Sequence, residues 1–163
     1  VVDFSQEVAV DPGTDARTGY RLGLRRRPVG TVYAVVPWNW PLNLTAHKIA
    51  PAIAAGCPTV LKASPVAPLA TLRLAAVLNS FLPPGAISAW NGPDSELGGI
   101  VHEVDFLSFT GSAGVGRRLR AERPELPAIL ELGSTAAVFV DRGADVARAA
   151  ERTAWGGFGF AGQ

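Results

Sequence analysis

The chain has 163 residues, a hydrophobic fraction of 48% and a formal net charge of +1. This length and composition are typical of a globular protein with a hydrophobic core, and the small net charge argues against a nucleic-acid partner. A single cysteine excludes an internal disulfide framework and favours a reducing, cytoplasmic compartment. No apolar stretch is long enough to span a bilayer, so we expect no membrane partner.

The first residues, 1–28, differ in pattern from the rest of the chain. Val8-Ala9-Val10 and residues 20–24 flank the turn-rich segment 11–15, which predicts a β-hairpin. Taken alone, such a two-stranded ribbon is marginally stable in water. The arginines at 25–27 are too few for a nucleic-acid-binding arm, and a solvated hairpin end explains them.

From Thr31 onward, short β-branched runs alternate with alanine-rich helical patterns. This alternation predicts repeated βαβ units, and hence an α/β fold with an open parallel sheet and flanking helices over residues 29–163. The predicted strands cover residues 31–36, 59–62, 86–90, 105–109, 128–132 and 136–140. The predicted helices cover residues 43–55, 68–80, 95–101, 113–123 and 144–155. In the helix over 68–80, four apolar residues lie on or near one face: Leu69, Leu72, Leu74 and Val77.

The segment Pro37-Trp38-Asn39-Trp40-Pro41 closes the first predicted strand. Its two prolines favour a turn at the carboxyl end of that strand, the edge where open α/β sheets bind ligands. The amide of Asn39 is an uncharged donor, and such a donor in a dry site can stabilise a developing oxyanion. A tryptophan-rich turn with a capping asparagine is the structural alternative.

Lys62 ends the second predicted strand, in the apolar run Val60-Leu61-Lys62-Ala63. A lysine is costly to bury unless its ammonium group reaches a partner, and a ribose hydroxyl or a phosphate would serve. The chain has only two lysines, Lys48 and Lys62, among 15 basic residues, which makes both of them candidates for a specific role. A lysine that extends along apolar surface to solvent is the alternative.

The glycine-rich segment 109–116 follows the fourth predicted strand and opens a helix. Its glycines allow the backbone to approach an anion, Ser112 supplies a hydroxyl, and the helix N-terminus adds exposed N–H groups. These features predict a pyrophosphate site. The alternative is that Ser112 is an ordinary helix cap.

Glu131 lies in an otherwise apolar run, Ile129-Leu130-Glu131-Leu132. We expect this carboxyl group to be buried, with a raised pKa that suits a general base. A paired structural glutamate is the alternative.

The remaining residues of chemical interest have structural interpretations. Cys57 is expected to be a buried structural thiol, because free cysteine usually behaves as a small hydrophobic residue. His47 and His102 lie in predicted helices without a second ligand at metal spacing, so we expect no metal site.

Five of these segments, in this order and spacing, resemble the aldehyde dehydrogenase superfamily, and the likeness covers Pro28 to Gln163. The resemblance implies a Rossmann-like cofactor-binding domain that takes NAD or NADP. It implies that Asn39 holds the thiohemiacetal oxygen and that Glu131 activates the water that hydrolyses the thioester. It also implies a ribose contact for Lys62. The implied cofactor-binding residues are Val36, Trp38, Lys62, Ser64, Gly92, Gly111, Ser112, Val115 and Leu132.

The resemblance further implies oxidation of a small-molecule aldehyde to a carboxylic acid through a cysteine thioester. Residues 158–163 are similar to the segment before the family's nucleophilic cysteine, which would be the second residue beyond Gln163. The lack of methionine and the start at Val1 also suggest a piece of a longer protein. We therefore expect the chain alone to be inactive as a dehydrogenase. A non-catalytic nucleotide-binding or oligomerising fragment, such as a degenerate paralogue, is the alternative.

Substrate and assembly follow only from the resemblance. Residues 41–48 and 157–163 look most like the branch that acts on semialdehydes, lactaldehyde and phosphonoacetaldehyde. In the family, a hairpin in the place of residues 1–28 builds the subunit interface, which implies a homo-oligomer. An interaction module whose hairpin self-associates as an edge strand, without nucleotide, is the alternative.

Two positions depart from the family pattern. Pro65 stands where the family often has a glutamate, three residues after Lys62, that binds both ribose hydroxyls. Proline cannot accept those hydrogen bonds, and the missing carboxylate removes a repulsion against a 2′-phosphate, so we expect NADP to be tolerated or preferred. Ser134-Thr135 replaces a second glycine and a lysine or asparagine, which affects loop geometry and leaves the carboxylate of Glu131 unchanged.

Overall fold

A computed structural model describes residues 27–160 of the chain. The chain divides into two compact units, Val1–Leu132 and Gly133–Gln163. The hairpin over residues 1–28 lies outside the described residues for almost all of its length, so it stays a prediction. Within residues 27–160, no helix has both the length and the apolar character needed to cross a membrane.

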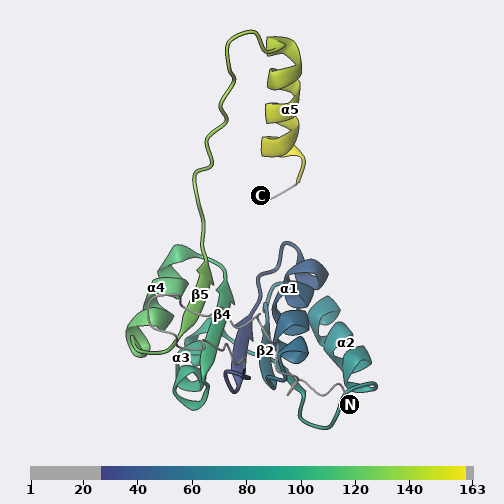
Figure 1. Cartoon of the computed structure of the whole chain (residues 1–163), viewed down its shortest axis with the longest axis vertical. Helices are drawn as coiled ribbons and strands as arrows, with labels where there is room; N and C mark the ends of the chain where they lie inside the picture. Colours follow the sequence, from purple (N-terminus) through teal and green to yellow (C-terminus); the bar gives the residue numbers. More distant parts are fainter. Residues whose placement is uncertain (1–26, 161–163) are drawn as a thin grey trace, which may run out of the picture. The chain divides into compact units, whose positions relative to one another are not determined.

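The first unit is built around a five-stranded parallel sheet (Figure 1). The strands are β1 (Val32–Val35), β2 (Thr59–Ala63), β3 (Ile87–Asn91), β4 (Phe106–Thr110) and β5 (Ala128–Glu131). Their order in the sheet is β3-β2-β1-β4-β5. The chain therefore proceeds outward in one direction from β1 to β3 and in the other from β4 to β5. Open α/β sheets bind ligands where the order reverses in this way, beyond the carboxyl ends of the two central strands.

Helical segments connect successive strands. Both α1 (Pro41–Ala54) and α2 (Pro68–Asn79) begin with a proline. The fixed φ of proline suits the first helical position, where the missing N–H would have no partner. The connection from β3 to β4 contains η1 (Asp94–Glu96), α3 (Leu97–Ile100) and η2 (Val101–Glu103), and α4 (Ala113–Glu122) leads to β5.

Alternate residues of β1 point to opposite faces of the sheet and enter two hydrophobic clusters. Tyr33 and Val35 pack with residues of α3, β4 and α4. Ala34 and Val36 pack with residues of α1 and α2. Figure 1 shows α1 and α2 together on one side of the sheet, with α3 and α4 on the other. The α/β fold with an open parallel sheet and flanking helices is confirmed.

The start of β1 is held against the start of β4 by one carboxylate. The N–H of Thr31 donates to Oδ2 of Asp105 at 2.7 Å. Gly30, with φ of +106°, brings the backbone so close that a Cβ there would lie 2.1 Å from the same oxygen. Glycine is required at this position both by its φ and by the space available.

The buried face of α2 differs from the predicted one. Its buried residues are Thr71 and Ala75, whereas Leu69 and Val77 are 80% and 46% exposed. The hydroxyl groups of Thr71 and Thr45 of α1 share a hydrogen bond of 3.2 Å, with both residues fully buried. Close approach of the two helices favours small side chains between them, and this constraint is absent from the local apolar pattern.

The second unit contains α5 (Val146–Phe158), which the sequence predicts with bounds of 144–155. The carboxylate of Asp145 caps this helix by accepting a hydrogen bond from the N–H of Arg148 at 3.0 Å. The strand predicted over residues 136–140 is wrong, since these residues form no strand. A strand needs a neighbour for its backbone N–H and C=O groups, and the described part of this unit offers no strand to pair with.

Candidate functional site

A cavity of about 240 Å³ opens at the carboxyl edge of the sheet, where the strand order reverses between β1 and β4. Its lining comes from the ends of β1, β2 and β4, from the start of α4 and from η1. Every residue predicted to bind a cofactor lines this cavity except Gly92 and Leu132. The structure therefore brings together segments that lie far apart in the sequence.

Lys62 projects from the end of β2 into this cavity with its side chain only 2% exposed. The alternative of a lysine that extends to solvent is therefore wrong. Its Nζ donates to Oδ1 of Asp94 at 2.6 Å, and the Asp94 side chain is 55% exposed. Asp94 was not predicted as a site residue. Its position just after the third strand, at the same sheet edge as Lys62, was the signal that could have identified it.

The turn between β4 and α4 has the geometry of an anion site. Ser112 caps α4, because its Oγ accepts a hydrogen bond from the N–H of Val115 at 3.4 Å. A helix N-terminus leaves N–H groups without intrahelical partners and carries a partial positive charge. Gly111 and Ser112 also line the cavity. Ser112 is thus a helix cap, as the alternative supposed, and a cavity residue as well.

Three predicted residues lie in tightly packed surroundings, and of these only Gly111 belongs to the turn itself. A Cβ at Gly111 would lie 2.7 Å from the ring of Phe109, which is 2% exposed. Leu132 packs over α4, where a Cβ at Gly116 would meet its Cδ2 at 2.5 Å. Gly92 follows β3, and a Cβ there would lie 2.4 Å from the ring of Trp90. Gly92 and Leu132 are not among the residues that line the cavity.

The two predicted catalytic residues lie near the same edge. Asn39 is half-buried between β1 and α1. Glu131 ends β5, and its Oε2 accepts a hydrogen bond from the hydroxyl of Thr110 at 3.0 Å. The expectation of a buried Glu131 is wrong, since this residue is exposed. Among residues 27–160, β5 is an edge strand that pairs only with β4, and Glu131 and Ile129 are its exposed residues.

Lys48 of α1, a candidate for a specific role only through the scarcity of lysine, is buried. Its Nζ donates to the hydroxyl of Ser108 on β4 at 3.3 Å. Burial lowers the pKa of Lys48, and the negative charge of Glu131 partly opposes this shift. The scarcity of lysine in the chain was the signal that pointed to this residue.

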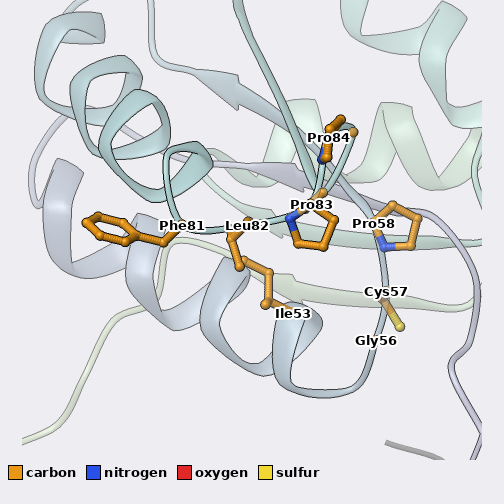
Figure 2. A pocket seen from close by; sticks show the side chains of 10 residues that line it. Ile53, Gly56, Cys57, Pro58, Phe81, Leu82, Pro83 and Pro84 are labelled. Carbon is orange, nitrogen blue, oxygen red and sulfur yellow. The ribbon is translucent and has the colours of Figure 1, made fainter. Parts of the chain in front are cut away.

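A second cavity, of about 610 Å³, opens at the opposite edge of the sheet, between the end of α1 and the segment after α2 (Figure 2). Its walls are apolar and include Ile53, Phe81, Leu82 and three prolines, and none of its lining residues is charged. Cys57 lies there and is 4% exposed, which confirms the prediction of a buried thiol. This cavity offers no group that would hold a phosphate.

The smaller cavity fits a dinucleotide in the chemistry of its donors. Lys62 supplies a cation for ribose hydroxyls or phosphate, and the N-terminus of α4 with Ser112 supplies donors for a pyrophosphate. Val36 and Val115 add apolar surface for planar rings. Between residues 27 and 160, no group of three or more His, Cys, Asp or Glu side chains could hold a metal ion. His47 and His102 are both exposed.

The sequence of this chain is similar to those of known aldehyde dehydrogenases. The family model described as aldehyde dehydrogenase family matches residues 5–163. The chain is 37% identical over 150 residues to a chloroplastic betaine aldehyde dehydrogenase from Amaranthus hypochondriacus, a match that covers 88% of this chain and 30% of that protein. Relatives of this kind are about three times as long, so the chain spans about a third of their length.

Two solved structures extend the likeness to three dimensions. A double mutant of betaine aldehyde dehydrogenase from Staphylococcus aureus, in complex with NAD+, matches with a TM-score of 0.76 and 35% identity, over 80% of this chain and 27% of that one. Glyceraldehyde-3-phosphate dehydrogenase GapN from Methanocaldococcus jannaschii, complexed with NADP, matches with a TM-score of 0.64 and 39% identity, over 68% of this chain and 26% of that one.

Proposed function

The chain belongs to the aldehyde dehydrogenase family, and on that premise we propose that it forms the cofactor-binding part of an NAD(P)-dependent aldehyde dehydrogenase. One observation carries the proposal. The ribose lysine, Lys62, and the phosphate turn at Ser112 line the same cavity, at the reversal of strand order. Residues 29–163 would belong to the nucleotide-binding domain and residues 1–28 to an oligomerisation hairpin.

Different cavity residues would bind different parts of the cofactor. Lys62 donates to the adenosine ribose, and the N-terminus of α4 with Ser112 binds the pyrophosphate. Gly111 keeps the turn compact against Phe109, so that the backbone N–H groups can approach an anion. When bound, NAD(P) accepts the hydride that leaves the substrate carbon.

Asn39 and Glu131 would serve the chemical steps. The amide of Asn39, in the turn after β1, donates to the oxyanion that forms when a thiolate adds to the aldehyde. Glu131 acts as the base that activates water for release of the acid. Its hydrogen bond from Thr110 fixes one carboxylate oxygen and leaves the other free to accept a proton.

The nucleophile of this reaction is proposed to lie outside the chain. Cys57 is the only cysteine of the sequence, and it lies buried at the edge of the sheet opposite the proposed site. The chain alone would therefore bind cofactor without turning over substrate. We also propose a small aldehyde as the substrate, a homo-oligomeric assembly and a cytoplasmic location.

Calorimetric titration of the purified chain with NAD and with NADP tests the proposal. We expect saturable binding of at least one of the two. Lys62→Met keeps the length of the side chain and removes the charge, and loss of a hydrogen bond to a charged group should weaken binding by about 10-fold or more. Phe81→Ala is the control, because Phe81 lines the other cavity and is 81% exposed.

The outcomes separate the two cavities. Weakening by Lys62→Met alone supports the site at the carboxyl edge. Weakening by Phe81→Ala alone would move the nucleotide to the opposite edge and contradict the assignment. If a folded chain binds neither cofactor, the non-catalytic structural interpretation is favoured.

A further inference from the structure

The pairing of Lys62 with Asp94 bears on which cofactor the site accepts. We infer that Asp94 makes this site select a dinucleotide with a free 2′-hydroxyl, NAD, over one with a 2′-phosphate, NADP. The inference rests on the proposed function, because it takes Lys62 as the ribose contact. It goes further by naming the residue that sets specificity.

The ion pair presents donors and an acceptor side by side. The Lys62 ammonium carries three N–H donors, of which one reaches Oδ1 of Asp94 at 2.6 Å. The Asp94 side chain is 55% exposed and lines the same cavity as Lys62, so a ligand in the cavity can reach this carboxylate. Two adjacent ribose hydroxyls can accept from the lysine and donate to the aspartate at once. A carboxylate that binds the ribose 2′-hydroxyl in this way is the usual basis of NAD selection in dinucleotide-binding folds.

A 2′-phosphate would meet a different balance of charge. Asp94 largely neutralises Lys62, and its carboxylate repels the phosphate dianion at short range. Arg118 also lies close, but its guanidinium donates to the backbone carbonyl of Asp94 at 2.7 Å. This hydrogen bond ties η1 to α4 and fixes the backbone that carries the carboxylate. Without the Asp94 charge, Lys62 and Arg118 would leave a net positive surface that favours a phosphate.

Pro65 leads to the opposite expectation when the sequence is considered alone. It lines the same cavity as Asp94, and proline accepts no hydrogen bond through its side chain. The structure shows that a carboxylate from η1, beyond the third strand, reaches Lys62 instead. The acidic group missing at residue 65 is therefore supplied by residue 94, from another segment of the chain.

The test compares two probes that differ only by the phosphate: ADP-ribose and 2′-phospho-ADP-ribose, titrated calorimetrically into the 163-residue chain. We expect ADP-ribose to bind at least 10-fold tighter. Asp94→Asn should reduce the ratio of the two affinities at least fivefold. Glu96→Gln removes the same charge from the same short helix, and Glu96 forms no ion pair among residues 27–160, so this control should leave the ratio unchanged.

Salt provides a second measurement that needs no variant. Repulsion by Asp94 is screened by ions, so raising the ionic strength from about 0.05 to 0.5 M should bring the two affinities closer in the wild-type chain. The preference for ADP-ribose should therefore fall as salt is added, whereas attraction of the phosphate by the site would make this preference rise with salt. This measurement keeps the inference testable even if Asp94→Asn does not fold with Lys62 left unpaired.

Each remaining outcome has a definite meaning. Equal or tighter binding of the 2′-phosphate probe by wild type overturns the role of Asp94 and leaves the proposed function intact. If Asp94→Asn and Glu96→Gln change the ratio of the two affinities equally, the effect comes from the net charge of the region, and the specific role of Asp94 is also overturned. Failure of a folded chain to bind either probe contradicts the proposed function itself, and the inference falls with it.

Discussion

Alanine at Gly111 and alanine at Gly114 should change the stability of the chain in opposite directions. At Gly111, an added Cβ would lie 2.7 Å from the Phe109 ring. That ring is 2% exposed and belongs to the core cluster beneath α4, so it cannot swing into solvent. Overpacking of this kind costs about 1–3 kcal/mol.

At Gly114, nothing lies within 4 Å of an added Cβ, and the residue is in the first turn of α4 without a positive φ. Alanine there restricts the unfolded chain and fits the helix, which stabilises by about 0.4–1 kcal/mol. The two variants should therefore differ by about 1.4–4 kcal/mol in the free energy of unfolding.

Urea denaturation of the two variants and the wild type, followed by circular dichroism, measures this difference. Gly111 precedes the Ser112 cap and Gly114 lies in the first turn of α4, so each variant is compared with the wild type as well as with the other variant. If Gly111→Ala proves as stable as Gly114→Ala, the Phe109 ring can move aside, and its close approach does not require glycine at residue 111.

Two further predictions concern single side chains. Ser112→Ala removes the cap of α4 and should cost about 1 kcal/mol of unfolding free energy, whereas Ser112→Thr should retain most of it; equal losses in urea titrations would contradict the capping role. Burial lowers the pKa of Lys48 below 10.5 in the folded chain. The unfolded chain therefore binds the proton of the Lys48 ammonium group more tightly than the folded chain does, and the free energy of unfolding rises with pH between the lowered pKa and 10.5. Lys48→Met should therefore be more stable than wild type at pH 7 and lose that advantage toward pH 10.5; a difference independent of pH would show that Lys48 is not the titrating group.

Local patterns in the sequence were enough to predict the parallel sheet. Short β-branched runs separated by helical patterns fall within one or two residues of all five observed strands. The same patterns placed Lys62 and the turn at Ser112 at one edge, because parallel strands end together. These features depend on neighbouring residues, which sequence analysis sees directly.

The missed features depend on contacts between distant segments. Lys62 meets Asp94 across 32 positions, and Lys48 meets Ser108 across 60. The burial predicted for Glu131 fails because β5 is an edge strand, and edge position is a property of the whole sheet. Residues 136–140 have a strand-like composition but no neighbour in their described unit to pair with. A local pattern can mark such residues as candidates, as the scarcity of lysine does for Lys48, but it does not identify their distant partners.

The two halves of the candidate site come from β2 and β4, which flank β1 in the sheet and are distant along the chain. Val32 pairs with Phe106, and the hydrogen bond from Thr31 to Asp105 spans 74 positions. Closing so long a loop costs chain entropy before the new contacts offset it. A partly folded chain with only β1, β2 and β3 in place would hold Lys62 without the N-terminus of α4. The dinucleotide proposed above needs both groups, so it would bind the finished sheet and no partly folded species. Its binding energy would then oppose unfolding without speeding the folding of the chain.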